Sequence, residues 1–93
     1  MVFLIRDNYI LAHGTKWDDD NIIKMFRDEV EVILSTSCTV YIDERPINDT
    51  PSKTILEKVD ELVYYLHKGT NVFTFKWNGI PSESVIHLQA YSI

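Results

Sequence analysis

The stretch from Thr50 to Gly79 constrains the fold most, because every local rule in it agrees. Thr50 is a helix-capping residue type, and Pro51 suits the first turn of a helix. Gly69 is typical of a helix end. The pattern therefore predicts a helix over residues 51–68. Apolar residues with a 3.6-residue period form its expected buried side: Ile55, Leu56, Val59, Leu62, Val63 and Leu66.

A β-hairpin is predicted directly after this helix. Residues 71–77 alternate in the manner of a strand, and Asn78-Gly79 is the dipeptide that tight hairpin turns prefer. Residues 81–84 are a poor strand, whereas residues 85–91 are a good one, with Ile86, Leu88 and Ala90 on one side. A helix followed by a hairpin indicates a small mixed α/β domain.

The first half of the chain predicts two short strands, a helix and a third strand. The strands are residues 2–5 and 9–12, joined by a turn at Asp7-Asn8, and residues 39–43, which Arg45-Pro46 ends. The helix begins at the Asp18–Asp20 run and continues to about Leu34. An alternative places a strand from Glu29, where polar and apolar residues alternate; the continuous helix is preferred because its apolar stripe stays in phase.

The expected architecture is a single α+β domain over residues 1–93. The element order ββ-α-β-α-ββ predicts a two-layer sandwich with a sheet of about five strands and both helices on one face. The segment 39–77 has the order β-α-β, which predicts a right-handed crossover between two parallel strands.

Charge and cysteine content restrict the class of partner. The net charge of −5, with nine cations against fourteen carboxylates, disfavours direct binding to nucleic acid or to anionic membranes. Cys38 is the only cysteine, and we find neither a secretory leader nor a run of ~18 apolar residues. These features favour a cytoplasmic protein.

Motifs for catalysis, metals and cofactors are missing from the sequence. His13, His67, His87 and Cys38 lack the short spacings of metal ligands. A nucleophile elbow and glycine-rich phosphate loops are absent, and the chain has only three glycines. Asp18, Asp19 and Asp20 lack a calcium-loop signature, so we interpret them as a helix N-terminus. We therefore predict no catalytic residue, no metal and no cofactor.

The aromatic residues of the hairpin are open to two interpretations. Phe73, Phe75 and Trp77 lie on one side of their strand, where they would either stack nucleic-acid bases or meet the two helices as core residues. The acidic net charge disfavours nucleic-acid binding and so favours the interpretation of these residues as core residues. The opposite face then becomes an alternative interface: Tyr41, Lys76, His87, Gln89 and Tyr91.

The function predicted from the sequence is a non-catalytic protein-binding module. By analogy, a short acidic chain suggests an inhibitor, or an immunity-type or anti-defence regulator, of a basic protein partner, for example one that processes nucleic acids. The alternatives are a homodimer or larger homo-oligomer joined through the open sheet face, and a small metal protein or enzyme. The carboxylates expected to meet a basic partner come from the first helix and its approach: Asp18, Asp19, Asp20, Asp28, Glu29 and Glu31.

Overall fold

A computed structural model describes residues 1–47, 53–77 and 85–93 of the chain. The elements follow one another as β1 (Val2–Arg6), β2 (Tyr9–Gly14), α1 (Asp20–Leu34), β3 (Cys38–Ile42), β4 (Arg45–Pro46), α2 (Ile55–His67), β5 (Asn71–Trp77) and β6 (Ile86–Ser92). The six strands form one sheet in the order β2-β1-β6-β5-β3-β4. The predicted Asn78-Gly79 turn and residues 81–84 lie outside the described ranges.

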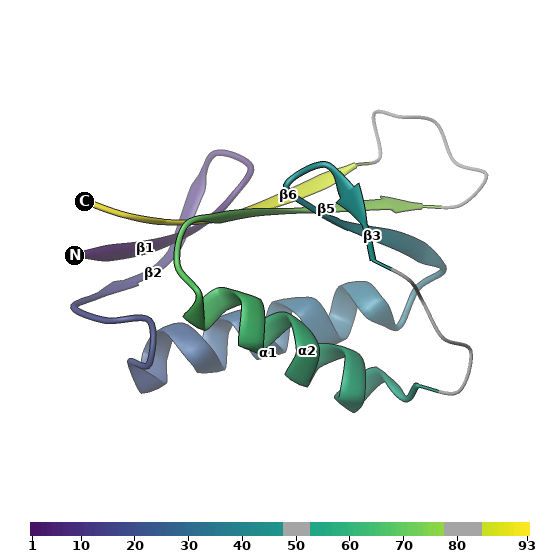
Figure 1. The fold of residues 1–93 in the computed structure, drawn as a ribbon, viewed down its shortest axis with the longest axis horizontal. Helices are drawn as coiled ribbons and strands as arrows, with labels where there is room; N and C mark the ends of the chain where they lie inside the picture. The colour runs from purple at the N-terminus through teal and green to yellow at the C-terminus, as the bar shows by residue number, and fades with distance from the viewer. Residues whose placement is uncertain (48–52, 78–84) are drawn as a thin grey trace.

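The predicted two-layer α+β arrangement is confirmed. Both helices lie side by side beneath one face of the sheet (Figure 1). The sheet has six strands instead of about five, because Arg45-Pro46 pairs with Tyr41 and Ile42 as the short strand β4 and does not simply end β3. Within the described residues, neither helix is long and apolar enough to cross a lipid bilayer.

The predicted parallel crossover is wrong, because β3 and β5 pair antiparallel. The physical reason is one additional chain reversal. A turn at Asp43-Glu44 folds β4 back along β3 before α2 begins. The chain therefore enters β5 from the end opposite to the one a simple β-α-β unit would use, and β5 runs against β3 (Figure 1).

Helix α1 matches its predicted extent. Asp19 is the N-cap, and its carboxylate accepts a 2.9 Å hydrogen bond from the backbone N–H of Asn21. The helix continues to Leu34, so the alternative strand from Glu29 is wrong. Its buried stripe consists of Ile22, Phe26, Val30 and Ile33.

Helix α2 begins four residues later than predicted, at Ile55. Its N-cap is Thr54, whose hydroxyl accepts a hydrogen bond from the backbone N–H of Glu57. The Glu57 carboxylate in turn accepts one from the backbone N–H of Thr54, which completes a capping box. Thr50 and Pro51, expected to start this helix, lie outside the described residues. The helix ends at His67, and Gly69 follows with a φ of +107°, as the sequence predicted.

The predicted buried side of α2 is correct only in part. Val59, Leu62 and Leu66 are buried, and Val63 packs partly against the core. Ile55 and Leu56 are 38% and 58% exposed, which corrects their assignment to the buried side. Leu56 is rotated about 90° away from the centre of the stripe, and Ile55 lies at the first position of the helix.

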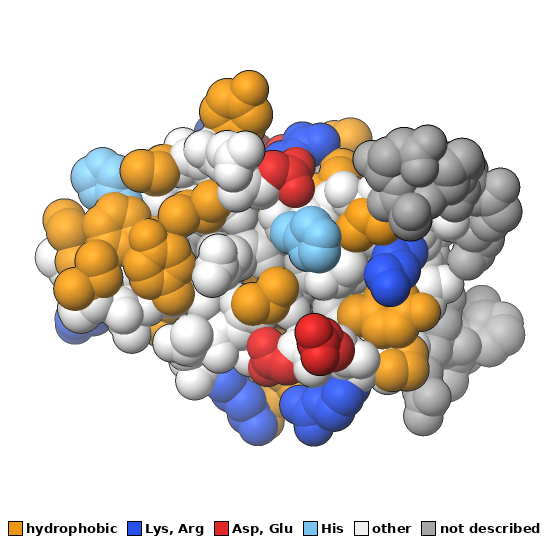
Figure 2. Space-filling model, turned by 90° about the horizontal axis from the view of Figure 1, so that it is seen from above, with side chains coloured by type: hydrophobic (Ala, Val, Ile, Leu, Met, Phe, Trp, Pro, Cys, Tyr) orange, Lys and Arg blue, Asp and Glu red, His pale blue; other side chains and the backbone are white. Residues whose placement is uncertain are grey.

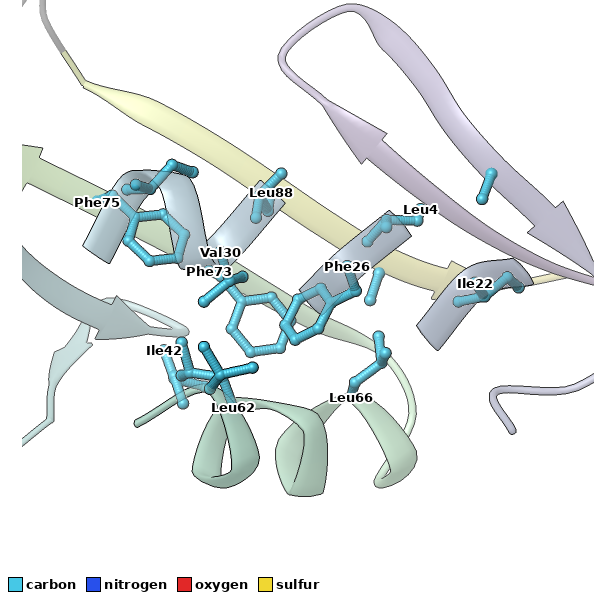
Figure 3. Packing of buried hydrophobic residues seen from close by; sticks show 14 of the residues in the cluster. Leu4, Ile22, Phe26, Val30, Ile42, Leu62, Leu66, Phe73, Phe75 and Leu88 are labelled. Carbon is cyan, nitrogen blue, oxygen red and sulfur yellow. The ribbon is translucent and has the colours of Figure 1, made fainter. Parts of the chain in front are cut away.

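The core fills the space between the sheet and the helices. Phe73 and Phe75 of β5 are fully buried, and the ring centroids of Phe73 and Phe26 are 5.2 Å apart (Figure 3). This confirms the core interpretation of the alternating aromatics, although Trp77 is only partly buried. β1 and β6 contribute Leu4 and Leu88 to the same cluster.

Candidate functional site

The face of the sheet opposite the helices carries the candidate site. Successive side chains of a strand point to opposite faces. Since Phe73 and Phe75 point toward the helices, their neighbours on β5 point to the open face. The same alternation and the strand pairing complete this face, whose members are Phe3, Ile5, Ile10, His13, Thr39, Tyr41, Val72, Thr74, Lys76, His87, Gln89 and Tyr91.

One end of the open face forms a polar depression of about 710 Å³. Its floor is a cross-strand row in which Thr74 of β5 pairs with Tyr41 of β3 on one side and His87 of β6 on the other. The Thr74 hydroxyl oxygen lies 3.3 Å from Nδ1 of His87. The Lys76 ammonium sits 4.9 Å from the centroid of the Tyr41 ring, a cation–π contact that places the charge above the sheet.

The turn between β3 and β4 forms the acidic rim of the polar depression. Asp43 and Glu44 line it, and both residues are exposed. Asp43 is held firmly: its backbone N–H donates to the Val72 carbonyl at 2.8 Å, and its carboxylate accepts from the Val72 N–H at 2.9 Å. The depression thus presents two carboxylates from the turn, and one ammonium and one imidazole from strands β5 and β6.

The other end of the open face is an apolar patch, formed by Phe3, Ile5, Ile10 and Tyr91. The rings of Phe3 and Tyr91, on neighbouring strands, stack with centroids 5.4 Å apart. Ile10 pairs with Ile5 and is 60% exposed. The His13 ring flanks the patch, with its centroid 6.0 Å from that of Phe3. Figure 2 shows hydrophobic side chains gathered at this end of the face and charged ones toward its middle and far end.

The five residues of the predicted alternative interface all lie on this open face. Tyr41, Lys76 and His87 line the polar depression, and Tyr91 belongs to the apolar patch. Gln89 is exposed on β6 between the two ends, where it pairs with Val72. The structure brings these residues together on one surface, as the alternation of their strands predicts.

The six carboxylates of the predicted acidic site are not equivalent in the structure. Asp19 caps α1, and Glu29 forms an ion pair with Arg6 of β1. Two of the six carboxylates predicted to contact a partner, Asp19 and Glu29, therefore make contacts within the fold instead. The others are exposed at or near α1: Asp18, Asp20, Asp28 and Glu31.

The possible ligands and nucleophiles lie apart from one another. His13, His67 and His87 belong to β2, α2 and β6, and Cys38 starts β3 with its sulfur 3.8 Å from the Ile33 carbonyl. Among the described residues, no group of three or more His, Cys, Asp or Glu side chains could hold a metal ion. Away from this face, a hydrogen bond that the exposed Lys68 ammonium donates to the Tyr64 side chain raises the pKa of Lys68.

Sequence reasoning missed the apolar patch and the acidic rim. The signal for the patch was available in part: once Leu4 is assigned to the core, its neighbours Phe3 and Ile5 must face the other way. The rim depends on the turn at Asp43-Glu44, which lacks the glycine or asparagine that marks tight hairpins. The apolar patch therefore depends on pairing between strands that are distant in the sequence, and the acidic rim depends on a turn without a recognisable sequence signal.

Comparisons of the chain with protein-family models, with curated proteins and with solved structures found no match.

Proposed function

We propose that this protein is a non-catalytic protein-binding module whose contact surface is the open face of the sheet. The observation that supports the proposal most is the composition of that face. Aromatic side chains from three strands, Phe3, Tyr41 and Tyr91, lie there among hydrogen-bonding groups. Aromatic anchors surrounded by adaptable polar side chains are enriched in protein interfaces.

The polar depression supports a protein partner in preference to an enclosed small molecule. Small-molecule sites enclose the ligand and bury most of its surface. Here Asp43, Glu44, Lys76 and His87 surround the depression and are all exposed to solvent. A side chain that protrudes from a partner surface could enter the depression and meet groups able to donate and accept hydrogen bonds.

The proposal is tested with two baits that carry the same change of charge on opposite layers. Lys76→Glu alters the open face and Lys24→Glu alters α1. Because both lysines are exposed, we expect the free energy of unfolding of each variant to lie within about 0.5 kcal/mol of the wild-type value. Proteins captured by each bait and by the wild type from a lysate of cells that carry the gene are quantified by mass spectrometry.

We expect Lys76→Glu to lose the proteins that the wild type captures, and Lys24→Glu to keep them. The reverse result, with capture retained by Lys76→Glu and lost by Lys24→Glu, would move the contact surface to the helix layer. Circular dichroism melting of both variants verifies that any loss reflects the surface and not unfolding.

A second candidate function is an acidic regulator that binds a basic protein through the helix layer. It is favoured by the exposure of Asp18, Asp20, Asp28 and Glu31. Negative surface accelerates encounter with a positive partner, and added salt weakens this steering. This candidate predicts that a bait with Asp28→Lys and Glu31→Lys loses its partner, and that capture by the wild type falls at high salt.

A further inference from the structure

We propose that the polar depression receives two oppositely charged side chains of one protein partner, a basic one at the acidic rim and an acidic one at Lys76. The proposal rests on the proposed function and names the chemistry of the partner at this end of the open face. It is carried by the charges at the two ends of the depression, by the polar floor between them and by the concave shape.

The charges around the depression are not neutralised by ion pairs within the fold. Among the described residues, the ion pairs are Arg6–Glu29, Arg27–Asp60 and Lys53–Glu61. Each of them involves a residue of α1 or α2, so none neutralises Asp43, Glu44 or Lys76. These three side chains are exposed. A hollow lined by charges focuses their field, so the two ends attract partner groups of opposite sign.

The two charged ends are separated along β5. Asp43 is hydrogen-bonded to the backbone of Val72, and Lys76 follows Val72 by four residues on the same strand and the same face. At ~3.4 Å per residue, the two backbone positions are about 13 Å apart. In an extended partner segment, side chains four positions apart have the same separation and also share a face. One basic and one acidic side chain with this spacing match both ends at once.

The floor between the charged ends can hydrogen-bond to the backbone of such a segment. Thr74 is only 8% exposed there, and its hydroxyl oxygen lies 3.3 Å from Nδ1 of His87. His87 is exposed, and an imidazole can donate to or accept from a peptide group. The Tyr41 ring supports the Lys76 ammonium at 4.9 Å from its centroid. The floor therefore suits a peptide backbone lying between two charged side chains.

Shape and charge together select a protruding segment of mixed charge. Two copies of this chain placed face to face would set one depression against the other and leave a void, whereas interface cores are packed as densely as protein interiors. A uniformly basic partner would place a cation against Lys76, and like charges in contact are unfavourable. An extended loop or strand that bears both signs fills the depression and meets neither obstacle.

The test is a titration of the isotope-labelled chain with synthetic peptides, followed through the NMR shifts of its backbone amides. The probe is an extended serine- and threonine-rich peptide with arginine and glutamate four positions apart and with both ends blocked. Two comparison peptides carry two arginines or two glutamates at the same positions. Lys76→Glu is the diagnostic variant, and Lys24→Glu on α1 is its matched control.

We expect the arginine–glutamate peptide to shift amides of β3, β5 and β6 around the depression, and to bind the wild type and Lys24→Glu equally. For Lys76→Glu the preference should change: the peptide with two arginines should bind at least about fivefold more tightly than the arginine–glutamate peptide, because an attraction replaces a repulsion. If Lys76→Glu does not fold, Glu44→Gln tests the other end and should weaken binding of the arginine–glutamate peptide at least about twofold.

The proposal is overturned if no peptide gives saturable shifts, or if the shifts lie on the helix layer. Equal binding of the arginine–glutamate and two-arginine peptides to the wild type would overturn it as well, because Lys76 would then take no part. If the peptides fail while protein capture by the wild type still depends on Lys76, this inference falls and the proposed function stands. If neither depends on Lys76, both fall.

Discussion

Asp43 and Glu44 occupy backbone positions that side-chain-bearing residues seldom adopt. Their φ angles are +49° and +69°, the pattern of the type I′ turn that joins tightly paired strands. Each such residue costs on the order of 1 kcal/mol relative to glycine. Asp43 offsets its cost through two hydrogen bonds with the backbone of Val72. Glu44 is exposed and projects its carboxylate at the acidic rim.

Replacing Glu44 with glycine should therefore stabilise the fold. We expect Glu44→Gly to raise the free energy of unfolding by about 0.5–1 kcal/mol, since glycine adopts a positive φ without steric cost. The control is Glu31→Gly in the last turn of α1, which should lower the free energy of unfolding by up to about 1 kcal/mol. Urea denaturation followed by circular dichroism measures both. Destabilisation by Glu44→Gly would show that the Glu44 side chain contributes more than its strain costs.

At the scale of elements, helix α2 is held to the sheet by a narrow stripe. Val59, Leu62 and Leu66 are at most 2% exposed, whereas Leu56 is 58% exposed on the same helix. A fully buried leucine side chain stabilises the folded state several times more than one that remains largely exposed. The stability that α2 adds to the fold therefore comes mainly from these three positions, with a smaller share from the partly buried Val63 and Tyr65.

Two leucine substitutions on α2 separate burial from composition. We expect Leu62→Ala to lower the free energy of unfolding by about 2–5 kcal/mol, because it leaves a cavity between α2 and the sheet. Leu56→Ala removes the same atoms from an exposed position and should cost less than about 1 kcal/mol. Chemical denaturation gives both values. Equal costs at the two positions would contradict the orientation of the helix.

The sequence predicts a helix or strand well where nearby residues alone determine it, and poorly where contacts with the rest of the fold decide. The extents of α1 and β5 follow from hydrophobic periodicity, which is visible within a single window. The start of α2 was misplaced because two capping signals compete: Thr50-Pro51 and, four residues later, the Thr54–Glu57 capping box. Each signal by itself is compatible with a helix N-terminus, and the packing of α2 in the folded protein determines which one is used.

The candidate site was predicted less completely, since it depends on pairing between distant strands. The apolar run of residues 2–5 has no alternation that shows which side chains face the helices. Pairing of β1 with β2 and β6 makes Phe3 and Ile5 part of the open face. The parallel crossover was predicted wrongly because the Asp43-Glu44 turn has no glycine or asparagine signal.

At the scale of the whole molecule, the apolar core and the sheet account for the fold. Aromatic, leucine, isoleucine and valine side chains from both helices and most of the strands form one cluster. Among the described residues, no buried side-chain nitrogen or oxygen lacks a hydrogen-bond partner. The histidines lie on separate elements. We predict that this apolar core is sufficient for folding and that no metal ion is required.

Thermal unfolding with and without a strong chelator tests this directly. A structural metal binds the folded state only, and removing it lowers the melting temperature. We expect the two melting curves to coincide. A fall of several degrees on chelation would reveal a metal site that the described residues do not form.

The place of β6 in the sheet has a consequence for how the chain acquires its structure during synthesis. β6 comes last of the six strands along the chain, yet it lies between β1 and β5. Val2 pairs with Ser92, so the β1–β2 hairpin joins the other strands only through a contact that spans nearly the whole sequence. Closing so long a loop is entropically costly, and such non-local pairing slows folding. On the ribosome, the two halves of the sheet therefore stay apart until β6 emerges and joins them.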